Sequence, residues 1–77
     1  MACALVLANT EAGQDTKAAK TLKRVKGVSN VCLVSGLYDV VATVKAKTAE
    51  DVLKIVYGKV RTIKGIEATH TMFCMDA

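Results

Sequence analysis

The stretch Val34-Ser35-Gly36-Leu37-Tyr38-Asp39-Val40 separates two apolar runs near the middle of the chain. Gly36 accepts a positive φ, so a tight hairpin turn between antiparallel strands is the plain interpretation. A phenol and a carboxylate, Tyr38 and Asp39, then begin the second strand. Together with free backbone amides, they could hold both ends of a zwitterion. The alternative is that Tyr38 covers the end of the sheet and Asp39 caps the turn.

Hydrophobic periodicity predicts four strands and two helices around this turn. Helical spacing begins at about residue 15, and Gly27 ends that helix. Thr48 is a good N-cap for a second helix, which Gly65 ends. The expected strands cover residues 2–8, 28–35, 39–47 and 66–75.

The two halves of the chain are copies in outline. Gly27 and Gly65 stand 38 positions apart, and the same offset relates Leu22 to Val60. It also maps Ala4-Val6-Ala8 onto Ala42-Val44-Ala46. Two such halves predict an α+β fold of the ferredoxin-like βαββαβ type, a four-stranded antiparallel sheet with two helices on one face. Residues 1–77 then form a single domain.

Strand alternation predicts which side chains lie on the sheet face away from the helices. If the repeated Ala4, Val6, Ala42 and Val44 face the helices, the opposite face carries Cys3, Leu5, Leu7, Val31, Leu33, Val41, Thr43, Thr69, Thr71 and Phe73. A solvent-facing side should be polar, whereas this one is largely apolar. We therefore expect a sheet-to-sheet homodimer. Its interface residues are Leu5, Leu7, Val31, Leu33, Val41 and Phe73.

Composition supports a partner subunit. Of the 77 residues, 52% are hydrophobic, and a domain of this size buries only about 60–65% of its surface. No run of about 18 apolar residues predicts a membrane span. Residues 1–3 lack the basic segment of a signal peptide, so we expect a cytoplasmic protein that does not contact membranes.

Charge and cysteines exclude other classes. The net charge of +4 lies on the polar faces of the two expected helices. No aromatic platform accompanies it, so a solvated surface is favoured over nucleic-acid contact. Cys3, Cys32 and Cys74 match neither a disulfide framework nor zinc-ligand spacing. We expect neither a metal nor a cofactor.

His70 is the only histidine. Alternation places it on the helix-facing side, remote in sequence from any carboxylate. Neither an activated serine nor a phosphate-binding loop is present, so no catalytic residue is assigned and we expect a protein that is not an enzyme. Thr69 and Thr71 flank His70 as ordinary β-branched strand residues, unless a ligand pocket lies nearby.

Five segments together resemble one known family. They are Thr10…Gly13, Leu22…Val25-Lys26-Gly27-Val28, Gly36-Leu37-Tyr38-Asp39-Val40-Val41, Val60…Ile63-Lys64-Gly65-Ile66 and Thr69-His70-Thr71. Over essentially its whole length, the chain resembles the effector-binding and oligomerisation domain (RAM domain) of the leucine-responsive/asparagine-regulated (Lrp/AsnC) transcription regulators. The Gly-x-Tyr-Asp signature and its spacing to both Gly-hydrophobic pairs make the resemblance specific.

The resemblance implies dimers that pack sheet on sheet and assemble into octameric rings of four dimers. It also implies an amino-acid effector bound where dimers meet, beside the Gly-x-Tyr-Asp turn. On that basis Gly36, Leu37, Tyr38 and Asp39 bind the ligand. Thr69 and Thr71 are further ligand-binding candidates.

Regulators of this family usually carry an N-terminal helix-turn-helix domain, and nothing here precedes the first strand. We therefore expect a stand-alone form that does not bind DNA by that route. It would sense amino acids or modulate full-length Lrp/AsnC regulators by co-assembly. The alternative is a small dimeric α/β-barrel enzyme of the monooxygenase-like kind, which uses similar plaits and needs a polar or His-containing cavity.

Overall fold

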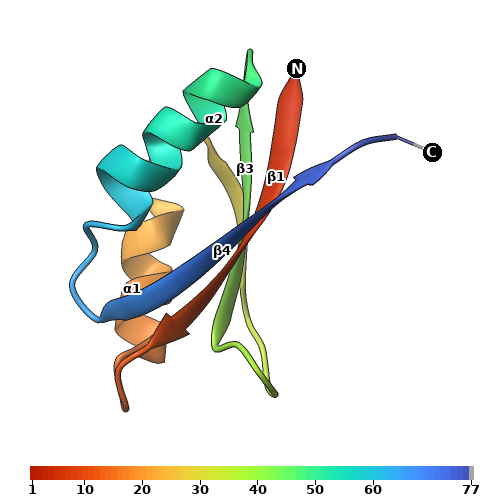
Figure 1. Ribbon diagram of the computed structural model, residues 1–77. Helices are drawn as coiled ribbons and strands as arrows, with labels where there is room; N and C mark the ends of the chain where they lie inside the picture. The colour runs from red at the N-terminus through yellow and green to blue at the C-terminus, as the bar shows by residue number, and fades with distance from the viewer. Residues whose placement is uncertain (77) are drawn as a thin grey trace.

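Four strands and two helices make up the computed structural model, which describes residues 1–76 (Figure 1). The strands are β1 (Ala2–Thr10), β2 (Val28–Leu33), β3 (Val40–Ala46) and β4 (Ile66–Cys74). The helices are α1 (Asp15–Lys23) and α2 (Ala49–Ile55), and α2 continues into a π-helical turn, η1 (Val56–Val60). The strands are ordered β2-β3-β1-β4, and every neighbouring pair is antiparallel. This is the predicted ferredoxin-like βαββαβ fold.

Local chemistry explains where the helices begin and end. The Thr48 hydroxyl accepts a hydrogen bond from the Asp51 amide at 3.1 Å, which caps the start of α2. Helix α1 ends at Lys23, before the expected position, and Gly27 instead makes the turn into β2 with φ of +99°. Gly65 makes the corresponding turn into β4 with φ of +98°. The left-handed conformation at both positions explains why each is glycine.

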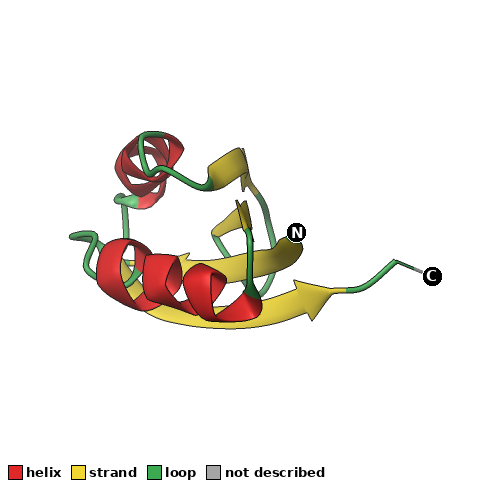
Figure 2. Cartoon of the chain, turned by 90° about the horizontal axis from the view of Figure 1, so that it is seen from above, coloured by secondary structure: helices red, strands yellow, loops and turns green. Residues whose placement is uncertain are grey.

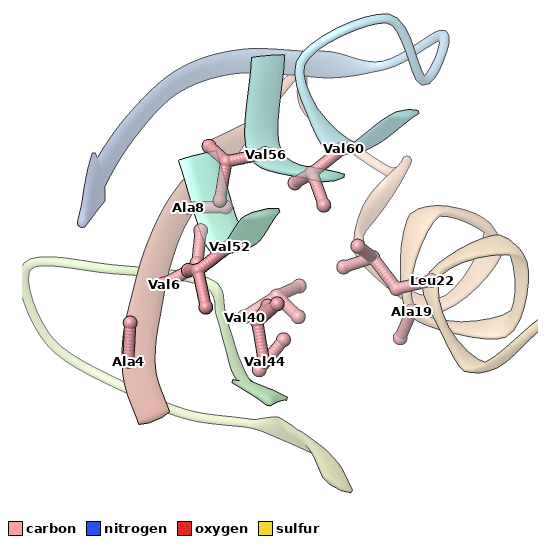
Figure 3. Packing of buried hydrophobic residues seen from close by; sticks show 11 residues of the cluster. Ala4, Val6, Ala8, Ala19, Leu22, Val40, Val44, Val52, Val56 and Val60 are labelled. Atoms are coloured by element: carbon pink, nitrogen blue, oxygen red, sulfur yellow. The ribbon is translucent and has the colours of Figure 1, made fainter. Parts of the chain in front are cut away.

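The core lies between the sheet and the two helices, which cover the same side of the sheet (Figures 1 and 2). Figure 3 shows Val52, Val56 and Val60 pointing from α2 and η1 toward the strands. Ala19 and Leu22 contribute from α1, and both are buried. The sheet supplies small aliphatic side chains of β1 and β3, namely Ala4, Val6, Ala8, Val40, Ala42 and Val44. The predicted helix-facing row of these two central strands is confirmed.

The internal repeat is visible in the pairing of the central strands. Ala4 pairs with Val44, and Val6 pairs with Ala42. Val44 is the repeat copy of Val6, and Ala42 is the repeat copy of Ala4. Ala4 and Val6 therefore each lie opposite the copy of the other. The β1–β3 pair has a pseudo-twofold relation that the 38-residue offset predicts.

A bulge in β2 exchanges the faces predicted for that strand. Its register with β3 shifts between Val28 and Asn30, so Ser29 is an extra residue. Because side chains alternate along a strand, one extra residue reverses the two faces beyond it. Val31 and Leu33 pair with the buried row of β3 and lie on the helix side. The prediction that they lie on the opposite face is wrong.

Strand β4 repeats this bulge 38 positions later in the sequence. Its register with β1 shifts between Ile66 and Ala68, with Glu67 as the extra residue. His70 therefore lies on the face away from the helices, which corrects its predicted position. The residues that lie on the helix side, also contrary to the prediction, are Thr69, Thr71 and Phe73.

The sheet face that the helices leave uncovered, here called the open face, remains largely apolar. Its predicted members from β1 and β3 are confirmed as Cys3, Leu5, Leu7, Val41 and Thr43. The outer strands add Asn30, Cys32, Ala68, His70, Met72 and Cys74, and Lys45 lies opposite Cys3 near one end. All of these side chains are half-buried or exposed in the single chain, and Met72 is 52% exposed.

Two further observations apply to residues 1–76. None of their helices is long and apolar enough to cross a membrane. No group of three or more His, Cys, Asp or Glu side chains gathers there in a way that could hold a metal ion.

Candidate functional site

The hairpin between β2 and β3 is closed at its base and open at its tip. The Val34 amide donates to the Asp39 carbonyl at 3.0 Å. Gly36 adopts φ of +111°, and the space where a Cβ would lie has no atom within 4 Å. Leu37 at the tip is 88% exposed. The tight turn predicted from the sequence is therefore present, and its tip is free to contact another molecule.

Asp39 fastens this hairpin to the end of β1. Its amide donates to the Ala8 carbonyl at 3.0 Å. Its carboxylate atom Oδ2 accepts hydrogen bonds from the Thr10 amide at 2.8 Å and from the Thr10 hydroxyl at 3.3 Å. Asp39 thus caps the end of a neighbouring strand, whereas the sequence suggested a cap within the turn itself. Thr10 is not among the ligand-binding residues predicted from the sequence.

Tyr38 reaches across the sheet end to β4. Its ring meets the His70 ring edge to face, with centroids 5.6 Å apart and an interplanar angle of 70°. Tyr38 is half-buried and His70 is exposed. The phenol therefore covers part of the sheet end, as the structural alternative predicted, and brings the hairpin beside the only histidine.

The hairpin also presents unused hydrogen-bond donors. In the part of the chain that the structure describes, the amides of residues 35–38 donate to no protein acceptor. Successive free amides in a turn form a concave arrangement that suits an anion. Because Gly36 carries no side chain, an anion can approach the backbone closely.

A hollow of about 380 Å³ opens beside His70 at the β4 edge. Its lining consists of Arg61, Ile66, Glu67, Ala68, Thr69 and His70. The Arg61 guanidinium lies over the Tyr57 ring, 4.9 Å from its centroid. Among residues 1–76 the only ion pair joins Lys54 to Glu50, so Arg61 and Glu67 enter this hollow without a charged partner. One unpaired charge of each sign complements a zwitterion.

The internal repeat has a copy of this hollow. A smaller hollow of about 230 Å³ is lined by Lys23, Val28, Ser29, Asn30 and Val31. All five positions match the lining of the first hollow after the 38-residue offset. Both hollows open where an outer strand bulges. Only the hollow on β4 contains a carboxylate and a histidine, so the chemistry of a zwitterion site is specific to the second half.

The structure gathers most, but not all, of the predicted ligand-binding residues. Gly36, Leu37, Tyr38 and Asp39 are contiguous in the hairpin, and Thr69 lines the hollow beside His70. Thr71 pairs with Val6 further along the sheet and does not line this hollow. Sequence reasoning missed Arg61 and Glu67. Glu67 is the only charged residue within β4, a signal that could have identified it.

The sequence and the fold match a known class of regulatory domains. Residues 3–77 match the family model described as the Lrp/AsnC ligand binding domain. The chain therefore belongs to the Lrp/AsnC family, and the matched segment is its ligand-binding regulatory domain.

Relatives of two kinds are similar to the chain. An uncharacterized HTH-type transcriptional regulator of Pyrococcus furiosus is 43% identical over 54 residues. That match covers 70% of this chain and 36% of the relative, so the chain matches about a third of that protein. The crystal structure of TTHA0845 from Thermus thermophilus is 27% identical with a TM-score of 0.92, and the match covers 100% of this chain and 96% of that one. The crystal structure of FFRP-DM1 is 28% identical with a TM-score of 0.91, covering 97% and 100%.

Proposed function

We propose that this domain binds a free amino acid at the β2–β3 hairpin, and that binding is linked to the assembly of several copies. The observation that carries the proposal is the set of free amides of residues 35–38 beside the fixed carboxylate of Asp39. Membership of a family whose matching domain is described as ligand-binding supports it. The domain then acts as an amino-acid sensor in transcription regulation rather than as an enzyme.

An amino acid has two charged groups that this sheet end can accommodate. Its α-carboxylate takes hydrogen bonds from the free amides around Gly36. Its α-ammonium is attracted by the carboxylates of Asp39 and Glu67, of which Asp39 has one oxygen already engaged by Thr10. The Tyr38 ring forms a wall for the side chain of the ligand. Thr69 adds a hydroxyl at the β4 side, and Thr71 is the weaker of the two threonine candidates.

A second protomer completes the site. One turn is too shallow to enclose a ligand, because small-molecule sites bury most of the ligand surface. Leu37 is 88% exposed at the hairpin tip, which suits a contact with another copy. Dimers that meet at their hairpins would form the octameric ring of four dimers that the family resemblance implies.

The dimer itself forms through the open face. Its anchors are Leu5, Leu7, Val41 and Met72. Met72 takes the place of Val31, Leu33 and Phe73, which the bulges move to the helix side. Phe73 and Leu33 are 45% and 52% exposed on the other face and play no part in this contact. Co-assembly with full-length Lrp/AsnC regulators in the cytoplasm uses the same surfaces.

The monooxygenase-like alternative has less support. His70 contacts the Tyr38 ring, and within residues 1–76 no carboxylate forms a hydrogen bond or ion pair with it. General acid–base catalysis by histidine usually relies on a positioned partner. The relatives with a stated role are transcriptional regulators.

Calorimetry and thermal melts with each of the twenty amino acids test the proposal. We expect one or a few to bind, and to stabilise the fold by about 2.7 kcal/mol at a hundredfold excess over Kd. Asp39→Asn keeps an oxygen for Thr10 but removes the charge, so it should fold and bind at least tenfold more weakly. Glu50→Gln removes a charge from an exposed ion pair and is the matched control. Absence of binding at millimolar amino acid, or equal binding by Asp39→Asn, contradicts the proposal.

A further inference from the structure

We propose that a second ligand site, for a small organic anion with an apolar body, lies between the two helices at the opposite end of β3 from the hairpin. A hollow of about 660 Å³ opens there between the end of α1, the end of β3 and the junction of α2 with η1. Pockets for small molecules typically measure about 300–1,000 Å³. The hairpin site lies before Val40, whereas this hollow begins beyond Val44, so the two sites are separate.

The floor of this hollow is apolar. Val25, Ala46 and Ile55 line it, and each is half-buried rather than fully covered. Gly27 lines it as well, and a Cβ there would come within 2.6 Å of the Ile55 side chain. The glycine therefore lets Ile55 lie in the floor. Burial of this floor by an apolar ligand would be favourable by the usual hydrophobic gain.

The rim of the hollow carries charge of one sign only. Its charged side chains are Arg24, Lys26 and Lys59, and no acidic residue lines it. Lys45 also lines the hollow, but it lies opposite Cys3 in the strand pairing, so its side chain belongs to the open face. In residues 1–76 the single ion pair is elsewhere, so none of the three rim cations has a charged protein partner. Cations that surround an apolar floor complement a ligand with an anionic head and an apolar body. An alkyl carboxylate is the simplest ligand of that class.

The hollow is formed by separate parts of the chain. The rim cations Arg24 and Lys26 follow α1, Lys59 belongs to η1, and β3 contributes its end. The Lys45 amide donates to the Gly27 carbonyl at 2.8 Å, which fixes two of these segments against each other. The site is therefore positioned by the fold, and a ligand there would contact both helical segments. Its occupancy is independent of the amino-acid site proposed above.

The test compares octanoate with 1-octanol, which has the same chain length and no charge, on the ¹⁵N-labelled protein. We expect octanoate to move the amide signals of Gly27, Ala46 and Ile55 in a saturable way at millimolar concentration. Octanol should bind at least tenfold more weakly, because it gains nothing from the rim cations. Signals of the open face, such as Leu5, should move less than those of the hollow.

A charge-matched pair of variants isolates the rim. Lys26→Glu with Lys59→Glu reverses two rim charges, and we expect about a tenfold or greater loss of octanoate affinity. Lys20→Glu with Lys64→Glu makes the same change in net charge at exposed positions outside the hollow, and affinity should stay within about threefold because salt screens distant charges. Equal binding of octanol and octanoate overturns the proposal, as do equal losses in the two double variants or signal changes confined to the open face. The first comparison uses only the parent protein, so it decides even if a variant folds poorly.

Discussion

Leu5 and Thr43 lie directly opposite one another in the β1–β3 pair, and the 38-residue offset of the internal repeat carries one position onto the other. The pseudo-twofold axis of the fold therefore passes between these two residues. Both lie on the open face, near its middle. A dimer with twofold symmetry uses the same patch on both subunits. A sheet face that has its own pseudo-twofold axis therefore suits contact with a second copy of itself.

Leu5→Asp should therefore convert the dimer proposed above to monomers. In the single chain Leu5 is only half-buried, so the carboxylate can be hydrated and the monomer should still fold. In the dimer the same charge would be buried without a partner, at a cost of several kcal/mol. Sedimentation velocity measures the change in mass, and circular dichroism checks that the fold is kept.

Leu37→Asp provides the contrast for this prediction. Leu37 lies at the exposed hairpin tip, outside the strands that form the open face. We expect this variant to remain dimeric and to lose only the larger assemblies. A folded Leu5→Asp variant that still sediments as a dimer would show that the open face is not the dimer interface.

Sequence reasoning identified the fold and the inner strands but not the faces of the outer strands. The alternation of Ala4 and Val6, and its copy at Ala42 and Val44, gives the buried row directly. The bulges at Ser29 and Glu67 have no comparable signal in a single sequence, because an extra residue in a strand changes neither composition nor length noticeably.

The candidate site was predictable to a similar extent. The hairpin was found because a glycine, a phenol and a carboxylate are adjacent in the sequence, at Gly36, Tyr38 and Asp39. The hollow lined by Arg61, Glu67 and His70 comes from residues 61–70 alone, but it opens at the bulge of β4, which a single sequence does not show. The contact between the Tyr38 and His70 rings joins distant segments and follows from strand register, which local patterns do not determine.

Gly27→Ala should destabilise the protein more than Gly36→Ala. Both glycines have a strongly positive φ, so each substitution introduces backbone strain of about 1–2 kcal/mol. At Gly36 the new methyl group meets open space. At Gly27 it would lie 2.6 Å from Ile55 Cδ1 and 3.3 Å from the Lys45 carbonyl oxygen, which adds a packing cost of about 1–3 kcal/mol. Urea unfolding measures both free energies, and equal losses would contradict the crowding at Gly27.

Gly58→Ala should stabilise the protein by roughly 0.5–1 kcal/mol. Gly58 lies within η1, its φ is not positive, and a Cβ there would meet no atom within 4 Å. Alanine loses less backbone entropy than glycine when the helix forms. A rise in the urea midpoint with an unchanged slope is the expected result. A fall in the midpoint would mean that the π-helical turn requires glycine.

The tie between Asp39 and Thr10 allows the last prediction. Asp39 Oδ2 accepts from both the amide and the hydroxyl of Thr10, and both residues are half-buried. Asp39→Ala leaves the Thr10 amide without its partner, which should cost about 1–3 kcal/mol of stability. Asp39→Asn keeps an acceptor oxygen and loses only the extra strength of a charged hydrogen bond, so its cost should be about half as large.

Thr10→Val separates the two hydrogen bonds of this tie. Valine removes the hydroxyl, whose bond is 3.3 Å long, but keeps the amide, whose bond is 2.8 Å long. Because the shorter bond is the stronger one, Thr10→Val should cost less than Asp39→Ala. Hydrogen exchange at the Thr10 amide reports the bond directly: protection should fall in Asp39→Ala and persist in Asp39→Asn and Thr10→Val. If Asp39→Ala leaves that protection unchanged, Asp39 does not hold the hairpin against β1, and its carboxylate is wholly available to a ligand.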